Sequence, residues 1–104
     1  GLALSSRNAY LSRSERSRAA LFPEILFLTA RQLRGRRRPP SEVLQGARED
    51  LSRVEGVEVD YIELVDSRTF QATRDIDKNQ SVLVGAICIG TTRLIDSVWF
   101  DEDW

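Results

Sequence analysis

Apolar residues recur at three- and four-residue spacings in the first third of the chain, the pattern of an amphipathic helix. The recurring positions are Ala19, Leu21, Phe22, Ile25, Leu26, Leu28 and Leu33. Upstream of them, residues 12–15 read Ser-Arg-Ser-Glu, a capping box in which the Ser hydroxyl accepts from a backbone N–H and the Glu reaches back. The pattern predicts a helix from Ser12 to near Leu33. We expect a kink or a break around Phe22, because Pro23 removes a backbone hydrogen bond and crowds the preceding turn.

A second helix is predicted after a connector of Arg and Pro. Residues 35–40 read Gly-Arg-Arg-Arg-Pro-Pro, which favours a loop because the paired prolines oppose helix. We expect Ser41 to cap the helix and Gly56 to end it. Its apolar face consists of Val43, Leu44, Ala47, Leu51 and Val54.

From residue 57 the hydrophobic period changes to alternation, which indicates a β-strand. The alternation slips by one position before Ile62, as a β-bulge would produce. Residues 66–80 are typical of a long loop, the apolar run 82–89 is typical of a central strand, and a third strand is expected at 92–100 after a turn at 90–91. Two helical segments followed by three strands predict an α+β fold, a two-layer sandwich of helices on a three-stranded, mainly antiparallel sheet.

Composition limits the chemistry available to this chain of 104 residues, which is long enough for one domain. It has no His and one Cys, so the chain itself offers no Ser-His-Asp or Cys-His catalysis, no His-ligated zinc and no internal disulfide.

The single Cys88 points to a reducing compartment, and we expect the cytoplasm. Its first residues do not resemble a signal peptide, and its longest apolar run is too short to cross a membrane. Because it lacks Met, we expect a piece of a longer soluble protein.

Charge is divided unevenly along the chain. Residues 1–50 hold ten Arg and five acidic residues, a net charge of +5, whereas residues 51–104 hold five basic and eleven acidic residues, a net charge of −6. Fourteen of the fifteen basic residues are Arg, whose forked donors suit phosphate and carboxylate groups. Residues 4–8, Leu-Ser-Ser-Arg-Asn, add hydroxyl and guanidinium donors just before a helix start. This set suits an anion, although such residues are also common in ordinary loops.

Three segments resemble the pantothenate synthetase family, also called pantoate-β-alanine ligases. The first is residues 1–12, Gly-Leu-Ala-Leu-Ser-Ser-Arg-Asn-Ala-Tyr-Leu-Ser, which is similar to the signature that opens the family's C-terminal domain. The others are residues 59–64, Val-Asp-Tyr-Ile-Glu-Leu, and residues 90–96, Gly-Thr-Thr-Arg-Leu-Ile-Asp. They occur in the family's order and extend over almost the whole chain. Residues 1–104 are therefore identified as a C-terminal lid domain of this family.

The resemblance implies an enzyme that joins pantoate to β-alanine with ATP through a pantoyl-adenylate, releasing AMP and pyrophosphate, with magnesium assisting. It also implies an N-terminal Rossmann-like domain, not contained in this chain, that carries a His-x-Gly-His motif and forms a homodimer. Carried over residue by residue, the ATP-binding positions are Leu4, Ser5, Ser6 and Arg7. Leu4 would act chiefly through its backbone, and Arg7 would be the catalytic residue. We expect the fragment alone to be inactive.

The chain departs from the family pattern at three of the positions compared. Leu4 stands where the family often has Met, Cys88 where it usually has Arg, and Ser97 where it usually has Asn. The change at Leu4 is mild for a backbone contact, the changes at Cys88 and Ser97 concern local sheet and loop contacts, and the Ser-Ser-Arg stretch is intact.

Other polar clusters have plainer interpretations. Residues 36–38 are expected to be a solvated connector, because no aromatic residue accompanies them and the chain is net acidic. We expect Arg93 to pair with a local acid such as Asp96, residues 101–103 to form an acidic terminus that binds no metal, and Cys88 to be an inert core thiol. The alternative function is a non-catalytic module whose basic first half holds an anionic partner such as RNA. For the ligase we expect no nucleic-acid and no membrane partner.

Overall fold

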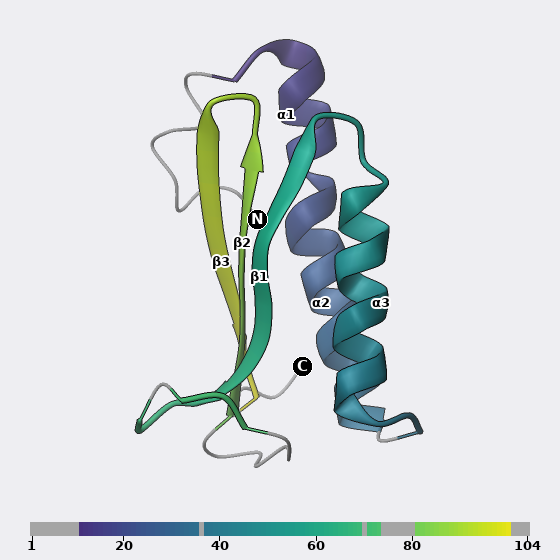
Figure 1. The fold of residues 1–104 in the computed structure, drawn as a ribbon, viewed down its shortest axis with the longest axis vertical. Coiled ribbons are helices and arrows are strands. Elements are labelled where there is room, and N and C mark those ends of the chain that lie inside the picture. Colours follow the sequence, from purple (N-terminus) through teal and green to yellow (C-terminus); the bar gives the residue numbers. More distant parts are fainter. Residues whose placement is uncertain (1–10, 36, 70, 74–80, 101–104) are drawn as a thin grey trace.

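Three helices cover one face of a three-stranded antiparallel sheet in the part of the chain that the structure describes (Figure 1). This computed structural model describes residues 11–35, 37–69, 71–73 and 81–100. The elements in chain order are α1 (Arg13–Ala19), α2 (Leu21–Gly35), α3 (Pro40–Ser52), β1 (Val57–Asp66), β2 (Ser81–Ile89) and β3 (Thr92–Trp99). The predicted two-layer α+β sandwich is confirmed.

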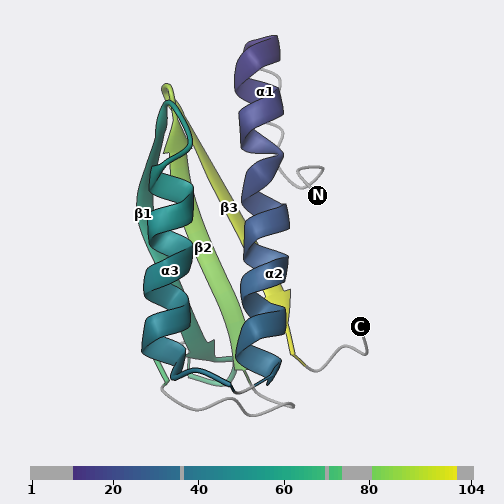
Figure 2. The ribbon, with the colours of Figure 1, turned by 90° about the vertical axis from the view of Figure 1, so that its right-hand side faces the viewer.

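The first helical segment begins and breaks where the sequence predicts. The Ser12 hydroxyl accepts from the Glu15 backbone N–H at 3.1 Å, and the Ser12 N–H donates to the Glu15 carboxylate at 3.0 Å, which completes the capping box. A turn at Ala20 separates α1 from α2, within one helical turn of Phe22. Pro23 provides no N–H to bond the carbonyl four residues earlier, so the interruption coincides with a missing helical bond. The two helices follow one another along one side of the molecule (Figure 2).

The start of α3 differs from its prediction. The helix begins at Pro40 rather than behind a Ser41 cap, and the residue before it, Pro39, makes no side-chain capping bond. Proline is compatible with this first position, because an N–H there would have no helical acceptor. The helix ends at Ser52, and Gly56, with φ of 80°, lies in the turn that leads into β1.

The strand predictions are confirmed. The strand order is β1-β2-β3, so the apolar run of β2 is central, and both pairings are antiparallel. The β1–β2 register shifts between Val59 and Tyr61, which places a bulge at Asp60. Gly90, with φ of 58°, lies in the turn between β2 and β3.

The core lies between the helices and the sheet. Its buried members are Leu11, Ala19, Phe22, Leu26, Ala30, Leu33, Val43, Ala47, Leu51, Val57, Ile62, Leu64, Leu83, Ile87, Ile89, Leu94 and Phe100. Two positions of the predicted α2 stripe, Leu21 and Leu28, are instead 39% and 47% exposed. The apolar stripe of α2 is therefore wider than the surface that the sheet and α3 cover.

Cys88 is not part of this core, which corrects its predicted role. Successive side chains of a strand point to opposite faces, and the neighbours Ile87 and Ile89 are both buried under the helices. Cys88 therefore points to the other face of the sheet, where it is a half-buried free thiol opposite Glu58 and Arg93.

Candidate functional site

The residues predicted to bind ATP, Leu4, Ser5, Ser6 and Arg7, lie outside the described residues, as do Arg36 and the acidic residues 101–103. The described chain begins at Leu11, which is 5% exposed and belongs to the core. The structure therefore defines where the predicted phosphate-binding segment joins the fold, and this junction is the described part of the candidate site.

Glu15 organises the junction. Its carboxylate accepts from the Ser12 N–H, so the backbone that follows the predicted segment is fixed at the first turn of α1. The pKa of Glu15 lies below its ordinary value because the backbone and hydroxyl of Ser12 hydrogen-bond its carboxylate, with a smaller contribution from the charge of Arg18. These bonds favour the ionised form, and the charge also suits the positive end of a helix.

The β2–β3 turn approaches the same carboxylate. A side chain at Gly90 would collide with the Glu15 carboxylate, and the Gly90 N–H donates to the Gly56 carbonyl at 3.4 Å. Three segments that are distant in the sequence therefore meet at one end of the molecule: the start of α1, the turn before β1 and the turn after β2 (Figure 1).

Arg18 is a cation at this junction that sequence reasoning missed. Its Nη1 lies 3.8 Å from the Glu55 carboxylate, and the two side chains are 30% and 90% exposed, so the pair contributes little to stability. Its Nε is buried and has no hydrogen-bond partner among the described residues. The only signal in the sequence was its position three residues after Glu15, on the same face of α1.

Arg93 does pair with an acid, but not with the predicted one. Its Nη2 lies 2.6 Å from the carboxylate of Asp60, at the bulge of β1. Asp96 instead accepts from the Ser97 backbone N–H at 2.8 Å. Residues 93 and 96 are an odd number of positions apart in one strand, so their side chains point to opposite faces.

The basic connector lies at the other end of the helices, between α2 and α3 (Figure 1). Arg37 and Arg38 are exposed, and Arg38 Nε lies 3.5 Å from the Glu42 carboxylate. This arrangement agrees with the predicted solvated connector, because an exposed pair four residues apart is typical of a helix start in water.

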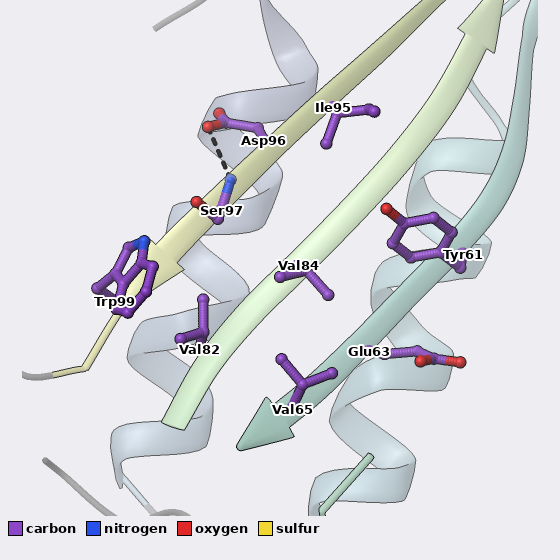
Figure 3. A pocket seen from close by; sticks show the side chains of 9 residues that line it. All are labelled: Tyr61, Glu63, Val65, Val82, Val84, Ile95, Asp96, Ser97 and Trp99. Atoms are coloured by element: carbon purple, nitrogen blue, oxygen red, sulfur yellow. Dashed lines mark hydrogen bonds between the residues drawn. The ribbon is translucent and has the colours of Figure 1, made fainter. Parts of the chain in front are cut away.

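A groove of about 630 Å³ lies on the sheet face that the helices leave uncovered (Figure 3). It is lined by Tyr61, Glu63, Val65, Val82, Val84, Ile95, Asp96, Ser97 and Trp99. The lining is mainly apolar, so the groove is suited to apolar packing.

Among the residues that the structure describes, no group of three potential metal ligands occurs, and none of the helices has both the length and the apolar character that a membrane span requires.

Comparisons with known proteins agree on one family. Residues 1–99 match the family model described as pantoate-beta-alanine ligase. The chain is 37% identical over 101 residues to the pantothenate synthetase of Enterococcus faecalis, covering 97% of this chain and 36% of that protein. It is 42% identical over 99 residues to the bifunctional pantoate ligase/cytidylate kinase of a Synechococcus species, covering 95% of this chain and 18% of that protein.

A solved structure gives the same result. The crystal structure of pantothenate synthetase from Thermus thermophilus superposes with a TM-score of 0.81 at 32% identity, covering 96% of this chain and 36% of that chain. The chain therefore spans about a third of the length of its single-function relatives, and about a fifth of the bifunctional one. With the family model, the sequence relatives and the fold in agreement, the chain belongs to the pantoate-β-alanine ligase family.

Proposed function

We propose that this chain is the C-terminal, ATP-phosphate-binding lid of a ligase that joins pantoate and β-alanine through a pantoyl-adenylate. The family match carries this proposal, because it includes residues 4–7 and corresponds to the C-terminal part of the relatives. The relatives are named for pantothenate synthesis and pantoate ligation, which supports the choice of substrates. We further propose that the intact enzyme is a cytoplasmic homodimer that associates through its N-terminal domain.

In the proposed reaction, a carboxylate oxygen of pantoate attacks the α-phosphorus of ATP. The bond from that phosphorus to the pyrophosphate oxygen breaks, so negative charge grows on the leaving pyrophosphate. The amine of β-alanine then attacks the acyl carbon of the adenylate, loses a proton and displaces AMP. Donors aimed at the growing charge lower the barrier more than they tighten ground-state binding of ATP.

Leu4, Ser5, Ser6 and Arg7 are the proposed phosphate contacts. A backbone group of Leu4 and the two Ser hydroxyls would orient the phosphates, and Arg7 would stabilise the leaving pyrophosphate with a permanent charge. The capping box at Ser12 and the buried Leu11 support this role, because they fix the chain a few residues after the contacts.

Magnesium is proposed to enter with ATP, whose phosphates it neutralises. Closure of the lid would also exclude water from the mixed anhydride, which water would otherwise hydrolyse. The catalytic His residues and the pockets for pantoate and β-alanine would lie in the N-terminal domain.

The test is Arg7→Ala in the full-length enzyme, with release of AMP as the assay. We expect turnover to fall by about 10²–10³-fold, the effect of removing one preorganised charge-stabilising donor. Arg13→Ala is the matched control, because it removes the same charge from an exposed position in the first turn of α1. Turnover within about twofold of wild type for Arg7→Ala would exclude Arg7 from the mechanism.

A second test needs only the gene. A region upstream of Gly1 that encodes a Rossmann-like domain with His-x-Gly-His would support the ligase. If the upstream region encodes no such domain, the catalytic role is withdrawn and the non-catalytic anion-binding module becomes the better description.

A further inference from the structure

A second groove, of about 670 Å³, lies where α2 leads into α3, at the end of the helical layer opposite the start of α1 (Figure 2). Its lining includes Leu28, Arg31, Gln32, Arg37, Arg38 and Val43. We call this feature the connector groove. Its volume lies within the range of about 300–1,000 Å³ that is typical of ligand sites. It shares no residue with the groove on the sheet or with the junction at the start of α1.

The connector groove is strongly basic. Residues 31–42 hold five Arg and one acidic residue, a net charge of +4. Arg31, Arg37 and Arg38 are exposed, and Arg38 lies 3.5 Å from the Glu42 carboxylate. No described residue forms an ion pair with Arg31 or Arg37. Because like charges gathered around one groove repel each other, an anion between them would be bound favourably.

The remainder of the groove is apolar. Leu28 is 47% exposed and lies three residues before Arg31 and four before Gln32, so these side chains are neighbours on one side of α2. Val43 of α3, which is 2% exposed, also lines the groove. No aromatic ring belongs to the lining among the described residues, so the bases of an RNA would find no surface on which to stack. Apolar and cationic groups side by side favour a ligand that is itself both apolar and anionic.

We propose that the connector groove binds an acidic segment of a partner protein, in which an apolar side chain is flanked by Asp or Glu. The forked donors of Arg bind a carboxylate through paired hydrogen bonds, and clusters of Arg are a recurrent means of recognising acidic peptides. The apolar side chain would pack on Leu28, and the flanking carboxylates would bind Arg31 and Arg37. This inference goes beyond the ligase function proposed above, because it rests on the groove alone and involves none of residues 4–7.

The experiment measures binding of a fluorescein-labelled acidic peptide to the full-length ligase by fluorescence anisotropy. In this peptide Glu residues surround two Leu residues that are four positions apart, as on one face of a helix. The reference probes are the same peptide with Lys in place of every Glu, and a uridylate oligonucleotide of equal net charge.

Two groove variants are compared with wild type: Arg31→Glu combined with Arg37→Glu, and Leu28→Ala. All three positions are exposed, so the substitutions leave the core intact. Arg53→Glu is the matched control, because it reverses a charge that is 76% exposed at the opposite end of α3.

We expect the acidic peptide to bind the Arg53→Glu variant within about twofold of wild type. Reversing both groove charges should weaken binding by about tenfold or more, because two attractions become repulsions, and this effect should shrink in about 0.5 M salt. Leu28→Ala should weaken binding by about fivefold, because less apolar surface is buried.

The proposal is overturned if the acidic peptide binds no more tightly than its Lys counterpart, or if the groove variants bind it as wild type does. Tighter binding of the oligonucleotide, with no effect of Leu28→Ala, would overturn it in favour of RNA. Loss of self-association in the double Arg variant, measured by sedimentation, would overturn it in favour of a second copy of the protein. No outcome depends on release of AMP, so a failure here and a failure of the test at Arg7 are distinguishable.

Discussion

Gly85, in the middle of β2, is the position where a single methyl group should disturb the core most directly. It faces the helices, and a Cβ there would lie 2.8 Å from Ile62 Cδ1 and 3.2 Å from both Leu26 Cδ1 and Phe22 Cε1. All three neighbours are fully buried, so none can move into solvent. The φ of Gly85 is not in the left-handed region, which means that steric contact alone decides the effect of Gly85→Ala.

Two opposing terms set the expected change in the free energy of unfolding. Overpacking a well-filled core costs about 1–3 kcal/mol. Replacing Gly by Ala also restricts the unfolded chain, which stabilises the fold by about 0.4–1 kcal/mol where the backbone fits. The contact at 2.8 Å is closer than real Cβ atoms show, so the first term is larger. We expect Gly85→Ala to destabilise the fold by about 1–2 kcal/mol.

The chain offers a control with the opposite sign. A Cβ at Gly46, in α3, would meet nothing within 4 Å. Gly46→Ala should therefore stabilise the fold by about 0.5–1 kcal/mol, the difference between Gly and Ala within a helix. The variant Ile62→Val removes the methyl group that lies closest to the added Cβ. In that background Gly85→Ala should cost about 1 kcal/mol less, because the two positions are in direct contact.

Urea unfolding of the 104-residue chain, followed by far-ultraviolet circular dichroism, measures all four variants. For a domain of this size, a loss of about 1–2 kcal/mol lowers the unfolding midpoint by roughly 1 M urea. If Gly85→Ala leaves the midpoint unchanged or raises it, or if Ile62→Val does not reduce its cost, the packing argument is wrong.

Three further predictions concern the surface of the domain and its ligand. The ionised carboxylate of Glu15 stabilises the fold above its ordinary pKa of 4.5, and this contribution should be lost as the pH falls through its lowered folded pKa. The unfolding midpoints of wild type and Glu15→Gln should therefore converge between about pH 7 and pH 3, and a difference between the two midpoints that stays constant with pH would contradict this. The side chains of the Arg93–Asp60 pair are 43% and 48% exposed, so a double-mutant cycle should give a coupling energy of about 0.5 kcal/mol, and a smaller one in about 1 M salt. A coupling energy that does not fall in salt would contradict the expected screening by solvent. Titration calorimetry of the isolated chain with magnesium and ATP should give a dissociation constant no tighter than about 1 mM, because one short loop lacks an opposite wall; micromolar binding would rule out the lid.

Local signals in the sequence determined the elements of this fold. The capping box of Ser12 and Glu15 specified the start of α1, because both bonds form between residues three positions apart. Pro23 specified a break, since its missing N–H affects the same helix. The phase slip before Ile62 predicted a bulge in β1, which the strand register places at Asp60, and the apolar run of β2 identified the central strand. Each of these signals acts within a few residues and does not depend on the rest of the molecule.

The clearest indication of the candidate site also came from the sequence. The stretch from Leu4 to Arg7 is recognised by its similarity to a family, and the family match includes it. Its role stays a prediction, because these residues lie outside the described part of the chain. The family match could not predict that Arg18 lies at this junction, because the residues near its guanidinium group, Glu55 and Gly56, belong to the turn before β1.

Only the tertiary structure decided which distant residues meet. Arg93 pairs with Asp60 rather than with Asp96, because strand register and the bulge set cross-strand neighbours, while spacing along one strand does not. Cys88 lies outside the core because its side chain points to the face of β2 that the helices do not cover. The contact of Gly90 with Glu15 likewise requires the β2–β3 turn to reach the start of α1. These contacts join segments far apart in the chain, and their geometry is fixed only when the helices and the sheet pack together.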